Sequence, residues 1–269
     1  MRRLERINVG IMRATVQVGW VNRLCSWFQR VPATMWVGFV LRKVLHVAGL
    51  ERLPPVPSLP PLMMVANHRS YFDFFIISLA LSQRGLPHRF TFPVRSRFFY
   101  DHPLGFPLNA AMSGCSMYPP IFRGGDREAD NAESIEAMVS ILVSGAGCVG
   151  IHPEGRRKRV GDPYELLPVR SGVGRVAVRS GAMVVPVFIQ GLDNDFLRQV
   201  LDFLRGRGGP VIVVFGEPVV IDDLVAEHTD HRVYRAVAER CKERIEALGE
   251  EERELRARLG PPPGQLAAG

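Results

Sequence analysis

The stretch that decides the fold is Leu62-Met-Met-Val-Ala66 with the polar run Asn67-His68-Arg69-Ser70-Tyr71-Phe72-Asp73 behind it. Five consecutive apolar residues after a proline-rich segment predict a short buried strand. The apolar positions that follow, from Phe72 to Ser82, predict a helix. A strand that leads into a helix is the repeating unit of α/β folds, and polar side chains at such a strand end are well placed for chemistry.

The same alternation continues along the chain. Further strands are predicted at Arg89–Val94, Gly147–Ile151, Met183–Ile189 and Val211–Phe215, and further helices at Asp130–Ser144, Gly172–Ser180 and Val233–Leu259. Strands that alternate with helices favour an α/β fold with a central, mostly parallel sheet flanked by helices.

The expected domain organisation has four parts. Residues 1–52 are predicted to form amphipathic helices at a membrane interface, residues 53–61 a proline-rich linker, residues 62–259 the main domain, and residues 260–269 a disordered tail. The first fifty residues carry eight arginines and lysines, the single acid Glu5, and several aromatic residues: Trp20, Trp27, Phe28, Trp36 and Phe39. Aromatic and basic side chains together favour the lipid headgroup boundary, although a helical cap packed on the domain is the alternative. No run is apolar enough for a clean membrane span.

Composition narrows the classes of partner. The formal net charge is +7, which favours anionic partners such as acidic lipid headgroups or nucleic acid. Four cysteines lie far apart without a CxxC pair, so neither a disulfide framework nor a structural zinc site is expected. The N-terminus lacks the pattern of a signal peptide. With the arginine-rich helices, it leads us to expect the cytoplasmic face of a bacterial-type membrane.

The first chemical constellation pairs His68 with Asp73. Histidine can accept a proton near neutral pH, and a turn at the start of a helix can bring a carboxylate five residues later back onto the ring. Asp73 would then hold the imidazole while His68 accepts a hydroxyl proton. The ordinary alternative is that Asn67 caps the helix and His68 is an unremarkable polar residue.

The second constellation is the loop His152-Pro153-Glu154-Gly155-Arg156-Arg157-Lys158-Arg159, which also follows an apolar strand. Its guanidinium and backbone N–H groups can hold a phosphate, and Glu154 can accept a hydrogen bond from an acceptor hydroxyl. A solvated basic loop or a nucleic-acid patch is the usual explanation of such a charge run. Two weaker signals are Arg123, in Ile121-Phe122-Arg123, and Pro186, in a strand where proline is compatible with an edge position.

Taken together, the segments NHRSYFD, IFR, HPEGRRK and VVPV resemble, in order and spacing, the four motifs of the glycerolipid acyltransferase family, which includes the 1-acyl-glycerol-3-phosphate acyltransferases. Phe215-Gly216-Glu217-Pro218 is similar to a later element of that family. The resemblance covers residues 62–220. It implies transfer of a fatty acyl chain from acyl-CoA or acyl carrier protein to a free hydroxyl of a lysophospholipid-type acceptor.

The resemblance also implies roles for individual residues. His68 matches the general base and Asp73 its partner, while Arg123, Glu154, Gly155 and Arg157 match residues that bind the acceptor. Pro186 matches the motif that shapes the acyl site. The expected partners are membrane lipids, a lysolipid acceptor and the acyl donor, with no nucleic acid, no metal and no other cofactor. The chain departs from the family's FPEGTRS motif at His152, Arg156 and Lys158, so an acceptor other than 1-acyl-glycerol-3-phosphate stays open.

Other interpretations account for fewer of these features. Gly172-Val-Gly174-Arg-Val-Ala177 matches a dinucleotide-binding pattern but lies late in the chain, and is expected instead to begin a helix close to the sheet. His228 and His231 lack a third metal ligand. A non-catalytic basic module that binds membrane or nucleic acid would explain the charge but not two polar motifs at strand ends. A thioesterase-like hydrolase, with water in place of the acceptor, also remains an alternative.

Overall fold

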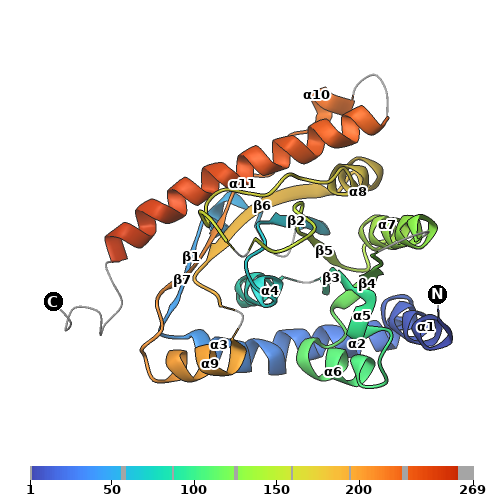
Figure 1. The fold of residues 1–269 in the computed structure, drawn as a ribbon, viewed down its shortest axis with the longest axis horizontal. Coiled ribbons are helices and arrows are strands. Elements are labelled where there is room, and N and C mark those ends of the chain that lie inside the picture. The colour runs from blue at the N-terminus through green and yellow to red at the C-terminus, as the bar shows by residue number, and fades with distance from the viewer. Residues whose placement is uncertain are drawn as a thin grey trace.

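The computed structural model describes residues 2–55, 59–86, 88–123, 127–158, 160–193, 195–225 and 230–259. Within these ranges the chain forms one seven-stranded sheet with helices on both faces (Figure 1). The strands run in the order β1-β7-β6-β2-β5-β3-β4 across the sheet. Their bounds are β1 Leu45–Ala48, β2 Leu62–Ala66, β3 Phe90–Arg95, β4 Met117–Ile121, β5 Cys148–Ile151, β6 Met183–Gln190 and β7 Val211–Phe215.

The pairing confirms the predicted α/β class with a mostly parallel sheet. Neighbouring strands are parallel except for β6 and β7, which pair antiparallel. Parallel neighbours need long connections, and helices supply most of them here. The carboxyl ends of β2 and β5 therefore lie side by side at one edge of the sheet, and the two predicted polar motifs follow directly from those ends.

Buried side chains alternate between the two faces of the sheet. In β2, Met63 and Val65 pack into one core, and Leu62, Met64 and Ala66 pack into the other. Helices α7 (Glu128–Val143), α8 (Gly172–Ser180) and α11 (His231–Leu259) cover the first face, and α3 (Thr34–Leu41), α4 (Asp73–Gln83) and α9 (Phe196–Leu204) lie on the second (Figure 1). The period of two along a strand thus divides the apolar residues between two layers.

The predicted helices at residues 72–82, 130–144, 172–180 and 233–259 correspond to α4, α7, α8 and α11. Helix α8 begins at Gly172, as the glycine-rich segment predicted. Gly174 lets α8 approach α11, because a Cβ atom there would lie 1.9 Å from the carbonyl oxygen of Tyr234. Sequence patterns did not reveal the short elements η2 Leu50–Arg52, α5 Ser96–Phe99, α6 Gly105–Ser113 and α10 Asp222–Val225. The predicted disordered tail, residues 260–269, lies outside the described residues, as does His228.

The N-terminal segment forms a nearly continuous helical arm: α1 (Arg3–Gln17), α2 (Gly19–Phe28), the π-helical turn η1 (Gln29–Ala33) and α3. Pro32 lies inside η1 and cannot donate a backbone hydrogen bond. The π turn is a single-turn bulge within the helix, and the dihedral angles at its two ends stay helical from α2 into α3. Among the described residues no helix is long and apolar enough to cross a membrane.

One expected boundary was wrong. Residues 45–48 were assigned to the N-terminal helices, but they form β1, which pairs in parallel with β7 at an edge of the sheet. The N-terminal segment and the main domain therefore share one sheet. A four-residue strand with His46 exposed carries too little alternation to be recognised from sequence.

Pro186 was also expected to be compatible with a strand edge, but β6 is a central strand that lies between β2 and β7. The antiparallel ladder with β7 covers Val187 to Gln190 and stops just before the proline. The carbonyl oxygen of Pro186 accepts the N–H of Gly216, 2.9 Å away. In an antiparallel pair the N–H and C=O groups of one residue point to the same neighbouring strand. Pro186 has no N–H to donate to β7, but it lies just beyond the end of the β6–β7 ladder, so no ladder hydrogen bond is lost.

Candidate active site

His68 and Asp73 meet at the carboxyl end of β2. The His68 Nδ1 atom lies 2.9 Å from Asp73 Oδ2. The loop between β2 and α4 turns back on itself, because the Asp73 carboxylate accepts the backbone N–H groups of Arg69 and Ser70 at 2.8 and 3.0 Å. Asp73 is the first residue of α4, where the helix dipole favours an acid.

These bonds assign the proton on the His68 ring. A carboxylate oxygen accepts, so Nδ1 carries the hydrogen and Nε2 keeps its lone pair. The His68 side chain is 20% exposed, whereas Asp73 is buried. Nε2 is therefore the ring nitrogen available to take a proton from a hydroxyl group.

Burial and charge determine the protonation states. Burial lowers the pKa of His68 to about 3, and the positive charges of Arg157, Arg69 and Arg123 act in the same direction. Burial raises the pKa of Asp73 to about 6, while His152 and the backbone N–H groups of Ser70 and Arg69 oppose that change. At neutral pH the His68 ring is therefore neutral, and its Nε2 lone pair is unprotonated.

Glu154 lies deep below this pair rather than on an open face. Its Oε1 accepts the backbone N–H of His68, and its Oε2 accepts the backbone N–H of Leu167, both at 2.8 Å. The buried guanidinium of Arg69 lies 3.6 Å from Oε2. We expected Glu154 to accept a bond from an acceptor hydroxyl, but both of its oxygens are engaged and the residue is 2% exposed. It joins the two strand-end loops instead.

The loop after β5 turns at Gly155. Its φ of +63° lies in the left-handed region, and a Cβ atom there would lie 2.9 Å from the Arg170 side chain. The carbonyl oxygen of Gly155 accepts a 2.6 Å hydrogen bond from the Arg123 guanidinium. The structure thus brings together Arg123 and the HPEG loop, which are far apart in sequence.

A group of arginines lies around the dyad. The Arg157 guanidinium stacks 3.6 Å above the exposed ring of Tyr71. The pKa of Arg123 is lowered by burial and by the charges of Arg95, Arg170 and Arg156. Neither Arg95 nor Arg170 was a predicted site residue. Arg95 ends β3, and an isolated arginine at a strand end carries no signal in sequence. Arg159 lies outside the described residues.

His68, Asp73 and His152 also place three metal-ligating atoms within 4.8 Å of one another. The two imidazole rings are stacked with centroids 3.8 Å apart and planes 10° from parallel. A metal ion binds in the plane of an imidazole ring, so one ion cannot lie in both of these planes. Asp73 already accepts the Nδ1 hydrogen of His68. His68 and Asp73 therefore form a hydrogen-bonded pair in this structure.

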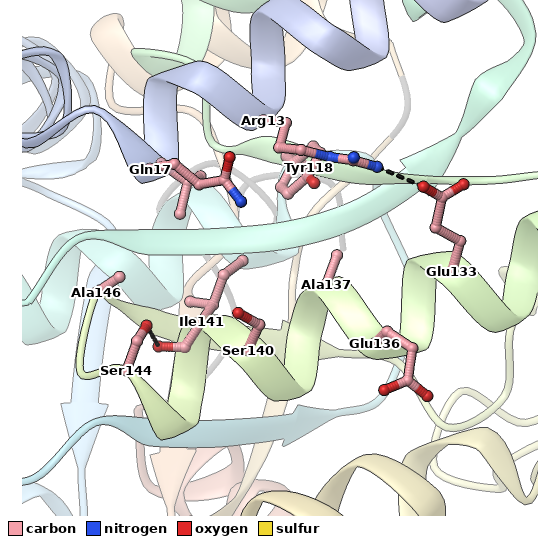
Figure 2. A pocket seen from close by; sticks show the side chains of 11 residues that line it. Arg13, Gln17, Tyr118, Glu133, Glu136, Ala137, Ser140, Ile141, Ser144 and Ala146 are labelled. Atoms are coloured by element: carbon pink, nitrogen blue, oxygen red, sulfur yellow. Dashed lines mark hydrogen bonds and ion pairs between the residues drawn. The ribbon is translucent and has the colours of Figure 1, made fainter.

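A separate groove of about 520 Å³ lies between α1 and α7. Figure 2 shows Arg13 reaching across it to Glu133, 2.5 Å away. Its lining includes Gln17, Tyr118 and Ser140 but none of the predicted site residues. The candidate active site is therefore the strand-end dyad and not this groove.

Comparisons with known proteins identify the class to which this fold and site belong. A sequence model of the acyltransferase family matches residues 44–190, more than half of the chain. The chain belongs to this acyltransferase family. The matched span runs from just before β1 to the end of β6 and includes both halves of the dyad.

Among solved structures, the chain is similar to the 1-acyl-sn-glycerophosphate (LPA) acyltransferase PlsC from Thermotoga maritima. The two share 19% sequence identity with a TM-score of 0.51, over 87% of this chain and 80% of that chain. At this identity the likeness concerns the fold. No curated protein matched the sequence.

Proposed function

We propose that this protein transfers a fatty acyl chain from acyl-CoA or acyl carrier protein to a free hydroxyl of a lysophospholipid-type acceptor, with 1-acyl-glycerol-3-phosphate as the first choice. The observation that carries the proposal is the His68–Asp73 pair, with Nδ1 bound to the carboxylate and several arginines close by. A neutral base beside a cationic surface suits a substrate that bears both a hydroxyl and a phosphate.

The reaction needs no covalent acyl-enzyme. The acceptor oxygen attacks the thioester carbonyl carbon as His68 Nε2 takes the hydroxyl proton. The Asp73 carboxylate stabilises the imidazolium that forms. The tetrahedral intermediate then collapses, the C–S bond breaks, and His68 returns the proton to the leaving thiolate. The products are an ester and a free thiol.

The acceptor phosphate is proposed to bind at Arg123 and Arg157, beside Gly155. Their charges both reach His68, as the lowered pKa of that histidine records. Guanidinium groups bind phosphate oxygens in a bidentate manner, which fixes the orientation of the acceptor as well as its affinity. The nearby Arg95, Arg156 and Arg170 add positive charge that would suit an acceptor more acidic than a single phosphate monoester.

The test is an acyl-transfer assay with labelled acyl-CoA and acyl carrier protein against a panel of lysophospholipids in mixed micelles. A diacyl product from one donor and one acceptor class supports the proposal and identifies the substrates. Free fatty acid without diacyl lipid would indicate a hydrolase instead. Folded protein that forms neither product would contradict the assignment.

The pH dependence of the reaction follows from the site's protonation states. As the pH falls through about 6, the pKa of Asp73, its carboxylate gains a proton and no longer stabilises an imidazolium. Both imidazoles have lowered pKa values of about 3 and stay neutral in that range. We therefore expect kcat/KM to fall as the pH drops below about 6. The apparent pKa of this fall describes the hydrogen-bonded group as a whole and not one residue. A profile that stays flat down to about pH 4.5 would contradict this assignment.

We further propose that the protein works at the cytoplasmic face of a bacterial-type membrane, bound through its N-terminal arm. Large apolar side chains on α2, η1 and α3 are exposed at helical spacing: Trp20, Leu24, Trp27, Val31 and Met35. Helix α6, which contacts η1, adds the exposed Leu108 and Met112, and its N-cap residue Leu104 is exposed as well. Basic residues on the arm would attract an anionic leaflet.

Replacing Trp20, Trp27 and Met35 together by serine should weaken binding to anionic vesicles about a hundredfold, since each large apolar side chain contributes on the order of 1 kcal/mol. Vesicle sedimentation measures this. The matched control replaces Val143 and Val220, exposed apolar residues outside the arm, by serine and should bind like the wild type. Equal binding by both variants would show that the arm is only a packed cap.

A further inference from the structure

His152 begins the loop after β5 and lies directly against the candidate base. Its ring is stacked on His68, with centroids 3.8 Å apart and planes 10° from parallel. On its other side it stacks on Phe74, with centroids 4.1 Å apart and an angle of 28°. His152 is therefore the middle ring of a three-ring stack that ends at His68.

The His152 ring is fixed in place by more than packing. Its Nδ1 lies 2.9 Å from the carbonyl oxygen of Ala66, the last residue of β2. A carbonyl oxygen only accepts, so Nδ1 carries the hydrogen of a neutral ring. Burial lowers the pKa of His152 to about 3, and protonation of the neighbouring His68 would act in the same direction, so the His152 ring is neutral at neutral pH. Its Nε2 is 4.0 Å from Asp73 Oδ2, beyond hydrogen-bond distance.

His68 needs such a neighbour. Its ring bond to Asp73 holds Nδ1 but still allows small rotations of the imidazole about the Cβ–Cγ bond, because χ2 of histidine is a broad torsion. The flat ring of His152, with its centroid 3.8 Å from that of His68, leaves no room for the imidazole to rotate toward it. The direction of the Nε2 lone pair then depends on His152 as well as on Asp73.

We propose that His152 is a positioning residue whose flat, fixed ring holds the His68 imidazole in the plane in which Nε2 meets the acceptor hydroxyl. It acts through His68 and does not touch the substrate. The assignment rests on the proposed acyl transfer. It goes beyond that function because it assigns a defined task to His152, a position at which the chain departs from its family's motif.

Three substitutions at His152 test whether its effect on kcat depends on a flat ring, on side-chain volume or on the imidazole group itself. His152→Phe keeps a flat ring and should retain kcat within about threefold, whereas His152→Leu, of similar bulk but not flat, should lose about tenfold. His152→Ala should lose up to about a hundredfold, the scale of loss when a reacting group is misplaced by about 1 Å. The KM for the acceptor should change less than about twofold in all three, because the residue does not contact it.

A second readout needs no substrate. The ring protons of His68 should show an upfield ring-current shift in NMR spectra of the wild type and of His152→Phe, and lose it in His152→Leu and His152→Ala. Circular dichroism establishes that each variant is folded. If the wild type makes no product but the shift follows this pattern, the acyl-transfer proposal fails and the ring geometry stands. The positioning role is overturned if His152→Phe loses as much kcat as His152→Ala, or if the loss lies in KM.

Discussion

Replacing His68 by alanine is expected to lower acyl transfer by about a thousandfold or more, which is within the range that a positioned general base contributes. Nε2 of His68 is the nitrogen left free once Nδ1 binds Asp73, and the alanine variant has no group to take the hydroxyl proton. The measurement is kcat for the best donor and acceptor pair. The variant should bind the acceptor and anionic vesicles as the wild type does, because the arginines and the N-terminal arm are unchanged.

The matched control is His46→Ala, which removes an exposed imidazole at the edge of the sheet and far from the dyad in the fold. It should transfer acyl chains at the wild-type rate. Loss of activity in both variants would point to damage of the fold rather than of the site. Wild-type activity in His68→Ala would contradict the role of His68 as the base and would favour another proton acceptor.

Replacing Glu154 by alanine should destabilise the fold by about 3–5 kcal/mol, the cost of removing one partner of a buried ion pair. The carboxylate accepts the N–H groups of His68 and Leu167, and it lies 3.6 Å from the guanidinium of Arg69. Without it two backbone donors lose their acceptor, and the buried guanidinium of Arg69, which still donates to the carbonyl oxygen of Pro163, loses its counter-charge. The denaturation midpoint in urea measures the loss.

Glu165→Ala is the control for this prediction. Glu165 belongs to the same loop region and pairs with Lys158, but its side chain is 73% exposed, so solvent screens the pair. Its removal should leave the midpoint nearly unchanged. A Glu154→Ala variant as stable as Glu165→Ala would show that the two strand-end loops are held together by other contacts.

Much of the fold followed from local pattern. The runs at residues 62–66, 147–151, 183–189 and 211–215 predicted strands because uninterrupted apolar residues suit the interior of a sheet. The structure forms strands at these positions. Strand β4 was not predicted, because the two consecutive prolines in Tyr118-Pro119-Pro120 are typical of a turn. Its prolines are tolerated at the outer edge of the sheet, beside β3 alone.

The site divides in the same way. By itself the sequence determined the chemical content of the two strand-end loops, because the donor and acceptor types of His68, Asp73 and the arginines belong to the side chains. The short spacing from His68 to Asp73 also made a local turn sufficient to join them.

Only the tertiary structure decided which groups from distant segments meet. The β2–β5 pairing brings His152 onto His68, and it places Glu154 under the loop that it binds. The edge strand β1 likewise depends on its parallel pairing with β7, across more than 160 residues. Such contacts are fixed by sheet register and by the burial of two apolar faces at once, neither of which is a property of a short stretch of chain.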